Sequence, residues 1–374
     1  MIIAIIIIIL FLSTSYLIFF IYLSLGHFKH LYKNKKKPDN KFSVIIAARN
    51  ESQYIDKLCE LLTKQDYPES HYEIIFIDDR SSDDTVEKIE NCKKEYNISI
   101  YKVSDYVEDE KYKNLIGKKR ALQIGIDKAR YELLAFTDAD CLPSLQWLSE
   151  LNKHFEKDID FVAGFSPFIY EQNSFINIFK SFERISIFAL CSASFGQKIA
   201  MTCTARNMAY RKENFIKVGG FSKIGMIMSG DDDLMLLMQR KLIRAYNFMF
   251  TESSIVPAKE KKSLIQHHHQ EIRRASKLKH YPAYLKTIIL LVAFYYLLIL
   301  ILFFLSLFSF VNWSIFIFLF SIKVVSDLIL IMPWLFKMKM YKYLVIFPII
   351  ELFYIPYFLF YGLKGTFGKY RWKN

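Results

Sequence analysis

Two aspartates separated by one residue, Asp138 and Asp140, are the strongest candidates for chemistry in this chain. They follow a short apolar run, Leu133 to Phe136, which is typical of a buried strand. In extended backbone, residues i and i+2 point to the same side, so both carboxylates can face one point at the carboxyl end of that strand. Oxygen ligands suit a hard divalent cation, which can bridge to phosphate oxygens. The pair alone also fits a solvated turn, so its interpretation depends on its surroundings.

Two further polar clusters follow predicted strands. The apolar run Phe42 to Ala48 ends in Arg49-Asn50-Glu51, and the run Tyr72 to Ile77 ends in Asp78 to Thr85. Strands alternate here with helix-like stretches, which predicts βαβ units and a mostly parallel sheet. Ligands of such sheets bind at the carboxyl ends of the strands. Each cluster alone could be only a turn and a helix cap, but three of them together predict a nucleotide-type site.

The chain has neither a G-x-G-x-x-G pattern nor a Walker A pattern, which argues against a dinucleotide cofactor and against P-loop hydrolysis. A metal and basic side chains must then meet any phosphate charge. Gly117-Lys118-Lys119-Arg120 offers such side chains just before a predicted helix, although it could also be a solvated basic helix start. The triplet Asp231 to Asp233 can supply a general base, because adjacent acids repel and can raise one pKa. Its alternative is an acidic helix N-terminus without catalysis.

The ends of the chain are apolar. Ile2 to Leu25 carries no charge and is long enough to cross a bilayer, and the lysines that follow it place that flank in the cytoplasm. Three further segments are predicted at 287–310, 314–336 and 344–363. We therefore expect a membrane anchor at 1–26, a cytoplasmic catalytic domain at 41–281 and a membrane domain at 285–366.

The basic tail after Leu363 conflicts with three full crossings, because it would then lie outside. One segment could instead be re-entrant or lie in the interface. Lys323 and Asp327 stand one helical turn apart inside the middle segment, where ionisable residues are functional candidates. The alternative is an i,i+4 ion pair that only stabilises the helices.

The formal net charge of +13 is concentrated near the apolar segments. Attraction to anionic lipid headgroups explains it better than nucleic acid does, so we expect membrane lipids and no nucleic acid as partners. The five cysteines lack zinc-site spacing and suit a reducing cytosol without a disulfide framework.

The order of these blocks resembles the family 2 glycosyltransferases with the GT-A fold. That family comprises inverting enzymes that depend on a nucleotide sugar and a metal, and it includes synthases of hyaluronan, chitin and cellulose and the ceramide glucosyltransferase. The resemblance runs from Phe42 to about Lys277. It implies an α/β fold, with a GT-A (nucleotide-diphospho-sugar transferase) domain of mixed, mostly parallel sheet flanked by transmembrane helices.

Several blocks carry the resemblance, and two of them depart from the family pattern. Arg80 stands where the family has Gly, and Arg274 replaces the Trp of Gln-x-x-Arg-Trp, which argues against processive polymerisation. The matching blocks are Val44 to Glu51, Ile77 to Thr85, Gly117 to Gly125, Asp138 to Asp140, Thr204 to Phe221, Ser229 to Leu234, and Gln270 to Arg274.

The resemblance assigns roles to individual residues. Asp140, assisted by Asp138, is expected to hold Mg²⁺ or Mn²⁺. Asp232 is the expected catalytic base, with Asp231 as the runner-up. The acceptor or diphosphate side is expected to contain Asn207, Gln270, Arg273 and Arg274. The residues expected to bind the nucleotide sugar are Ala47, Arg49, Glu51, Asp78, Asp79, Lys118 and Asp138.

We therefore expect a metal-dependent inverting glycosyltransferase of the cell membrane, with its catalytic domain in the cytoplasm. The donor would be a UDP- or GDP-sugar, and the acceptor would be lipid-linked or a saccharide. One alternative is a processive polysaccharide synthase that exports its product. Another is a non-catalytic assembly partner that retains a nucleotide-sugar domain, which the intact acids argue against. A transporter is disfavoured, because most of the chain is soluble and the membrane segments show no repeat.

Overall fold

A computed structural model of the chain describes residues 2–32, 39–95, 97–170, 174–259 and 264–368. It divides into two compact units. One unit consists of Met1–Phe28 together with Lys261–Asn374, and the other is Lys29–Glu260. Each unit has its own hydrophobic core.

The unit Lys29–Glu260 is built on a seven-stranded mixed sheet in the order β3-β2-β1-β4-β7-β5-β8. Strands β3, β2, β1 and β4 are parallel, whereas β7 runs antiparallel to both of its neighbours, β4 and β5. A second, small sheet pairs β6 with β9. The strands are β1 Phe42–Ala48, β2 Tyr72–Asp78, β3 Ile98–Lys102, β4 Leu133–Phe136, β5 Phe161–Gly164, β6 Phe168–Ile169, β7 Met208–Arg211, β8 Tyr246–Met249 and β9 Ala258–Lys259.

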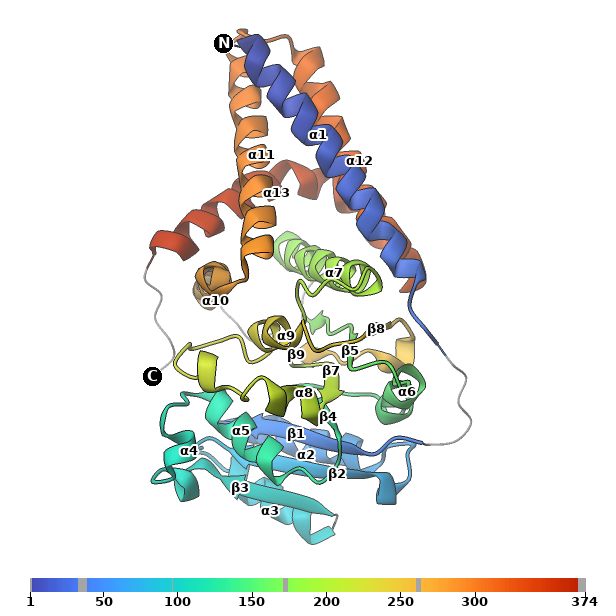
Figure 1. The fold of residues 1–374 in the computed structure, drawn as a ribbon, viewed down its shortest axis with the longest axis vertical. Helices are drawn as coiled ribbons and strands as arrows, with labels where there is room; N and C mark the ends of the chain where they lie inside the picture. The colour runs from blue at the N-terminus through green and yellow to red at the C-terminus, as the bar shows by residue number, and fades with distance from the viewer. Residues whose placement is uncertain (1, 33–38, 96, 171–173, 260–263, 369–374) are drawn as a thin grey trace. The chain divides into compact units, whose positions relative to one another are not determined.

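Helices connect these strands and cover both faces of the sheet (Figure 1). They are α2 Ser52–Thr63, α3 Thr85–Glu95, α4 Glu110–Lys113, α5 Lys118–Lys128, α6 Trp147–His154, α7 Phe175–Gly196, α8 Lys212–Lys217 and α9 Asp233–Gln239. Short 3-10 helices lie at Glu69–His71, Val103–Tyr106, Ser222–Ile224 and Glu252–Ser254.

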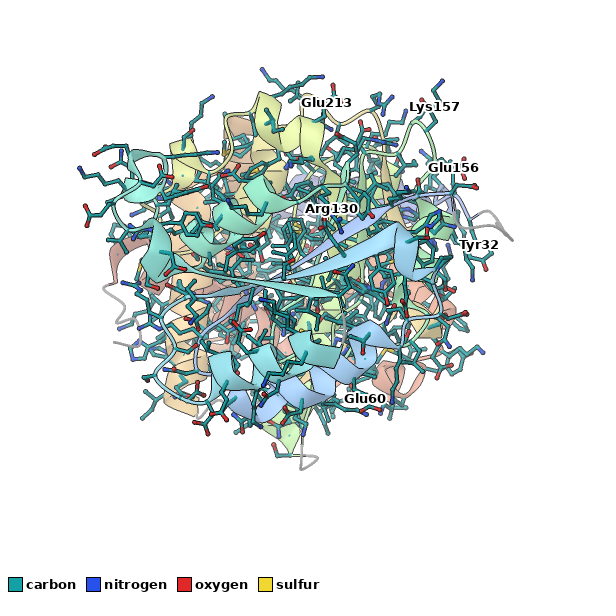
Figure 2. All side chains as sticks on the ribbon, turned by 90° about the horizontal axis from the view of Figure 1, so that it is seen from below. Tyr32, Glu60, Arg130, Glu156, Lys157 and Glu213 are labelled. Atoms are coloured by element: carbon teal, nitrogen blue, oxygen red, sulfur yellow. The ribbon has the colours of Figure 1, made fainter. Side chains whose placement is uncertain are left out.

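The apolar strands explain this layering. Alternate residues of a strand point to opposite faces, and β1 is buried on both. Val44 and Ile46 belong to the core formed with α2, whereas Ile45 faces α5 on the other side. Helix α5 approaches so closely that a Cβ atom at Gly125 would lie 2.5 Å from the Ile77 side chain. Charged side chains such as Glu60 and Lys157 lie at the outside of this unit (Figure 2).

The mixed, mostly parallel sheet predicted from the sequence is confirmed. Strands β1 and β4 have the predicted bounds, and β2 extends one residue further, to Asp78. The antiparallel strand β7 was not predicted, because a run of four residues has no periodicity that distinguishes it from a turn.

The other unit contains four helices that are long and apolar enough to cross a membrane. Helices α1, α11 and α12 lie side by side, and α13 runs across them in Figure 1. Within this unit, α13 also packs against α10. The helices are α1 Ile2–Ser24, α10 Leu264–Ser276, α11 Ala283–Leu307, α12 Trp313–Lys337 and α13 Lys342–Phe367, with short 3-10 helices at Leu25–Phe28 and Lys277–His280.

A charged network lies inside this helical unit. The predicted ion pair between Lys323 and Asp327 of α12 is confirmed, with Nζ 2.8 Å from the carboxylate. The lysine is fully buried and also contacts the carboxylate of Glu351 in α13, which the sequence did not indicate. The Tyr16 hydroxyl of α1 donates to Asp327 at 2.6 Å, and the Tyr296 hydroxyl of α11 lies 3.0 Å from that of Tyr16. The network thus links all four apolar helices.

Candidate active site

The two aspartates at the carboxyl end of β4 are brought together by a turn. The Cys141 N–H donates to the Asp138 carbonyl at 3.1 Å, so residues 138–141 are not the extended strand that the sequence suggested. The turn nevertheless places ligand atoms of Asp138, Asp140 and Cys141 within 4.8 Å of one another. Both carboxylates are half-buried, which leaves them accessible to a ligand.

The donor set of this turn indicates which metal it can hold. Cys141 is fully buried, and burial raises the pKa of its thiol well above the ordinary value. The thiol is fully buried whereas both carboxylates are half-buried, so the donors accessible to a ligand are the carboxylates of Asp138 and Asp140. Oxygen donors suit Mg²⁺ or Mn²⁺ and do not suit a structural zinc.

Lys118 connects the acidic groups of the site. It is the first residue of α5, and its ammonium contacts the Asp138 carboxylate and lies 3.2 Å from that of Asp231. Burial would lower the pKa of this lysine, but the charges of Asp138, Asp231 and Asp232 outweigh burial and raise it. Lys118 therefore stays charged and compensates for carboxylates that would otherwise repel one another.

The next residue, Lys119, fixes the loop that leads to the acidic triplet. Its side chain is 2% exposed, and its ammonium donates to the backbone carbonyls of Ile227 and Ser229. Gly230 follows with φ +89°, in the left-handed region that favours glycine, and a Cβ atom there would collide with Leu234. One turn of α5 thus positions both the Asp138 side and the Asp231 side of the site.

The three acids at 231–233 have different environments. The Asp231 carboxylate faces Lys118, whereas Asp232 caps α9 by accepting the Asp233 N–H at 2.8 Å. Asp233 is 4% exposed and accepts the Leu234 N–H at 2.8 Å. The helix-cap role considered for this triplet is therefore present, and it coexists with a direct connection to the Asp138 site.

The loops after β1 and β2 are tied together by hydrogen bonds at the predicted nucleotide end. Asn50 accepts the Ser82 N–H at 2.8 Å, and Asp83 accepts the Ser52 N–H at 3.1 Å. Glu51 donates its N–H to the Thr85 hydroxyl at 2.9 Å. These loops carry the predicted nucleotide-binding residues, of which Arg49 is exposed and Ala47 is half-buried.

Asp78 and Asp79 are both buried, and they shape the turn after β2. The Asp78 carboxylate accepts the backbone N–H groups of Arg80 and Ser81, each at 3.1 Å. Arg80 has φ +61°, which explains why the resembled family places Gly at this position. Here the two hydrogen bonds to Asp78 compensate for the strain of a non-glycine residue.

Asn207 is held by hydrogen bonds inside the protein. Its side chain is fully buried, its Oδ1 accepts from the Trp147 indole at 3.0 Å, and its amide donates to the carbonyls of Phe165 and Ser254. These bonds fix the segment just before β7. The expected contact of Asn207 with acceptor or diphosphate stays a prediction.

The remaining predicted residues lie outside the unit that contains the aspartates. Gln270, Arg273 and Arg274 are on α10, which belongs to the helical unit. Arg274 forms an ion pair with Glu271 at 2.9 Å. Their contribution to the site stays a prediction.

Sequence reasoning missed several buried cations, among them Lys119, Arg184 and Arg206. Lys119 was regarded only as part of a basic helix start, and Arg206 only as part of a longer block. Arg184 lies in α7 and is 7% exposed. The available signal was its position, a charge in the middle of the apolar helix Phe175–Gly196.

Three features define a nucleotide-sugar transferase domain with the GT-A fold. They are the order of the strands in the sheet, the Asp138–Asp140 turn, and the acids that α5 holds. A solved structure with this fold is the mannosyltransferase PcManGT from Pyrobaculum calidifontis, in complex with GDP-Man and Mn²⁺. It matches with a TM-score of 0.56 at 13% identity, over 98% of this chain and 99% of that one.

Residues 43–219 match the family described as Glycosyl transferase family 2 and form a domain of that family. The chain is 33% identical over 129 residues to the glycosyltransferase AglE of Haloferax volcanii, which is 34% of this chain and 40% of AglE. It is 30% identical over 128 residues to the dolichyl N-acetyl-alpha-D-glucosaminyl phosphate 3-beta-D-2,3-diacetamido-2,3-dideoxy-beta-D-glucuronosyltransferase of Methanococcus voltae. That match covers 33% of this chain and 38% of the relative, so the chain spans less than half the length of either protein.

Proposed function

We propose that this protein transfers a sugar from a nucleoside diphosphate sugar to a membrane-associated acceptor, with inversion at the anomeric carbon. The observation that carries the proposal is the convergence of Asp138, Asp140, Lys118 and Asp231 at the carboxyl end of β4. The leaving group of such a transfer is a diphosphate, and the acceptor hydroxyl must lose a proton. Both requirements need charged groups held close together.

The metal ligands in this proposal are Asp138 and Asp140. Their two carboxylates fit a divalent cation, and the mannosyltransferase of similar fold is described with Mn²⁺. When bound, the cation supplies Lewis-acid stabilisation of the diphosphate. The assignment does not depend on Cys141, whose thiol is fully buried.

The protein's own residues supply the other charges. Lys118 holds a proton and a positive charge beside Asp138, where it can stabilise the leaving phosphate. We assign the base to Asp232 by its place in the motif, and we assign to Asp231 the positioning of Lys118. The tied loops after β1 and β2, with Arg49 and Asp79, provide the nucleotide end.

The acceptor is proposed to be lipid-linked or a saccharide at the membrane surface. Four membrane-length helices support a membrane location, and the name of the Methanococcus voltae relative describes a dolichyl phosphate-linked substrate. We further propose that the catalytic unit lies in the cytoplasm, where nucleotide sugars are available, and that the protein resides in the cell membrane.

The direct test is a panel of UDP- and GDP-sugars incubated with the full-length protein in detergent, with Mn²⁺ or Mg²⁺, while release of nucleoside diphosphate is followed. At least one donor should give release that increases when membrane lipid extract is added as acceptor. If the protein bound a donor but neither released nucleoside diphosphate nor transferred sugar from any donor of the panel, the non-catalytic assembly partner would be favoured instead.

The first prediction concerns the metal. Asp140→Asn should abolish turnover and weaken Mn²⁺ binding by at least about tenfold, because an amide cannot neutralise the ion. Mn²⁺ binding is measured by electron paramagnetic resonance of the free ion, beside turnover. The matched control is Asp105→Asn, because Asp105 is exposed and its carboxylate accepts only from the neighbouring Ser104 hydroxyl. Full activity of Asp140→Asn, or full activity in excess chelator, would contradict the metal assignment.

A further inference from the structure

Two buried arginines that have no carboxylate partner in the described part of the chain lie next to the proposed metal site. Arg184 of α7 is 7% exposed, and Arg206, just before β7, is 8% exposed. Among the residues that the structure describes, neither guanidinium lies within 4.0 Å of a carboxylate. Among the described residues, the buried Nε of Arg184 has no hydrogen-bond partner, and its Nη2 donates a long hydrogen bond of 3.5 Å to the Ser166 carbonyl.

Both guanidinium groups contact one aromatic ring. The Arg206 guanidinium lies 4.4 Å from the centroid of the Phe168 ring, and that of Arg184 lies 4.8 Å from the same centroid. A contact between a cation and a ring stabilises a charge less than burial destabilises it, and two like charges around one ring also repel each other. Buried charges in proteins are normally paired, so two buried guanidinium groups without a carboxylate among the described residues are suited to bind an anion.

The topology places this pair beside the Asp138–Asp140 turn. Phe168 is in β6 and pairs with Ala258 of β9, and Ala258 also forms a bridge with Cys141. The arginines are therefore near the proposed metal ligands.

The position also separates this pair from the nucleotide end. The nucleotide loops follow β1 and β2, on one side of β4, whereas Arg206 precedes β7, which is the neighbour of β4 on the other side. The donor's diphosphate already has Lys118, and a cation held by Asp138 and Asp140 would meet the rest of its charge. An anion held by Arg184 and Arg206 is therefore better explained as part of the acceptor.

We propose that Arg184 and Arg206 form a phosphate-binding subsite that holds a phosphate group of a lipid-linked acceptor. Planar guanidinium groups match phosphate oxygens in a way that an ammonium group does not. This subsite rests on the proposed function, and it narrows the acceptor from any saccharide or lipid to a phosphorylated lipid.

The test measures binding and does not depend on turnover. The wild type, Arg184→Gln and Arg206→Gln are prepared as full-length proteins in detergent. Each is titrated separately with farnesyl phosphate, with farnesol, and with GDP or UDP in the presence of Mn²⁺. Both variants should bind farnesyl phosphate at least about tenfold more weakly, because a buried charged partner is lost. Nucleoside diphosphate binding should stay within about twofold, because those contacts lie elsewhere. The control is Arg130→Gln, because Arg130 (labelled in Figure 2) is 60% exposed, and its buried partner Glu73 keeps hydrogen bonds from the Ser43 hydroxyl and from the N–H of residue 130.

Three results would overturn the subsite. The first is that the wild type binds farnesol as tightly as farnesyl phosphate. The second is that the arginine variants keep full affinity for farnesyl phosphate. The third is that the variants lose nucleoside diphosphate binding instead, which would assign the arginines to the donor. The melting temperature without ligand distinguishes a folding defect. Removing an unpaired buried charge should not lower it, so a large fall in both Arg206→Gln and Arg206→Lys would show that the arginines are structural. If no nucleotide sugar supports transfer, the binding results still decide the subsite independently.

Discussion

At the scale of single residues, Lys118 is the group that allows several carboxylates to share one site. It contacts Asp138 and Asp231. The negative charges of these two residues and of Asp232 raise the pKa of Lys118. The two neighbouring acids at 231 and 232 are therefore not equivalent, because only Asp231 forms an ion pair with the lysine while Asp232 caps α9. Substitutions at the two positions should affect different steps.

The second prediction separates these acids. Asp232→Asn should leave donor binding within about twofold, because the diphosphate is held elsewhere, yet transfer should fall by about two to four orders of magnitude, the usual worth of a general base. Asp231→Asn should weaken donor binding and lower transfer less, because it loosens Lys118. Donor affinity by titration and single-turnover rates measure both effects.

The outcome decides the roles directly. If Asp231→Asn lost transfer and Asp232→Asn kept it, the base would be Asp231. If both variants transferred sugar normally, the triplet would be only a helix N-terminus and the base would have to lie elsewhere.

The sequence indicated the acids of the site but not how each one is used. Residue type and spacing identified Asp138 and Asp140, because carboxylates after predicted strands are visible in one dimension. Asp232 and its runner-up Asp231 were identified by the acidic triplet and its place in the family pattern. Asn207 is expected to contact a ligand, and only the structure shows that its side chain is held by Trp147, Phe165 and Ser254. Such partners are 42 to 60 residues away along the chain, and no local pattern encodes them.

At the scale of elements, the first turn of α5 positions two parts of the site at once. Lys118 contacts Asp138, and the Lys119 ammonium donates to backbone carbonyls of the loop at 227–229. A hydrogen bond from a charged donor is worth about 1.5–3 kcal/mol, so these two contacts constrain the loop strongly.

The third prediction follows for that loop. Lys119→Met keeps the apolar stem of the side chain but removes the donors, so the loop before Asp231 should become mobile. Transfer should fall by at least about tenfold while donor affinity changes little, since misplacement of a catalytic group lowers rate more than binding. Single-turnover rates and donor titration test this, with exposed Lys57→Met as the control. Unchanged transfer in Lys119→Met would show that the loop does not depend on this lysine.

The fourth prediction concerns pH and helix α6. His154 is 3% exposed, its Nδ1 bonds the Glu150 carbonyl at 2.9 Å, and burial lowers its pKa below the ordinary 6.5. As the pH falls, the unfolded chain takes up a proton at this histidine while the folded protein keeps it neutral. The contribution of His154 to the free energy of unfolding is therefore fully present above pH 6.5 and is lost as the pH falls below that value. The melting temperature should decline between pH 7 and pH 5, and His154→Gln should make that decline shallower. An equal decline in the variant would exclude His154 as its cause.

The elements themselves were predictable where the apolar pattern was strong. The runs at 42–48 and 133–136 became strands with those bounds, because a parallel sheet covered on both faces needs continuous apolar strands. The region after 155 was not predictable in the same way. Its strands are two to four residues long, and their pairing partners lie far away in the sequence.

At the scale of the whole molecule, the number of membrane crossings decides on which side the basic tail lies. Helix α13 runs across α1, α11 and α12 in Figure 1, and it contains Pro348 and Pro356. We propose that α13 lies in the membrane interface, which resolves the conflict that the positive-inside rule raised for the tail.

The fifth prediction tests that topology. Reporters inserted near Asn40 or Lys259, and a reporter after the last residue, should all indicate the cytoplasm. A reporter in the turn between α11 and α12, near Asn312, should indicate the opposite side. An extracytoplasmic reading at Lys259 would separate the catalytic unit from cytosolic nucleotide sugars and contradict the proposed donor.

The hydrogen bond between Tyr16 and Asp327 has a consequence for how the chain is made. These residues are 311 positions apart, and Asp327 shares Lys323 with Glu351. In the proposed topology, α1 enters the membrane long before its polar partners on α12 and α13 are made, because the whole catalytic unit is translated between them. A ribosome-bound chain that stops before α12 should therefore expose Tyr16 to lipid or to a membrane chaperone. Assembly of the helical unit is thereby delayed until α12 and α13 have been translated.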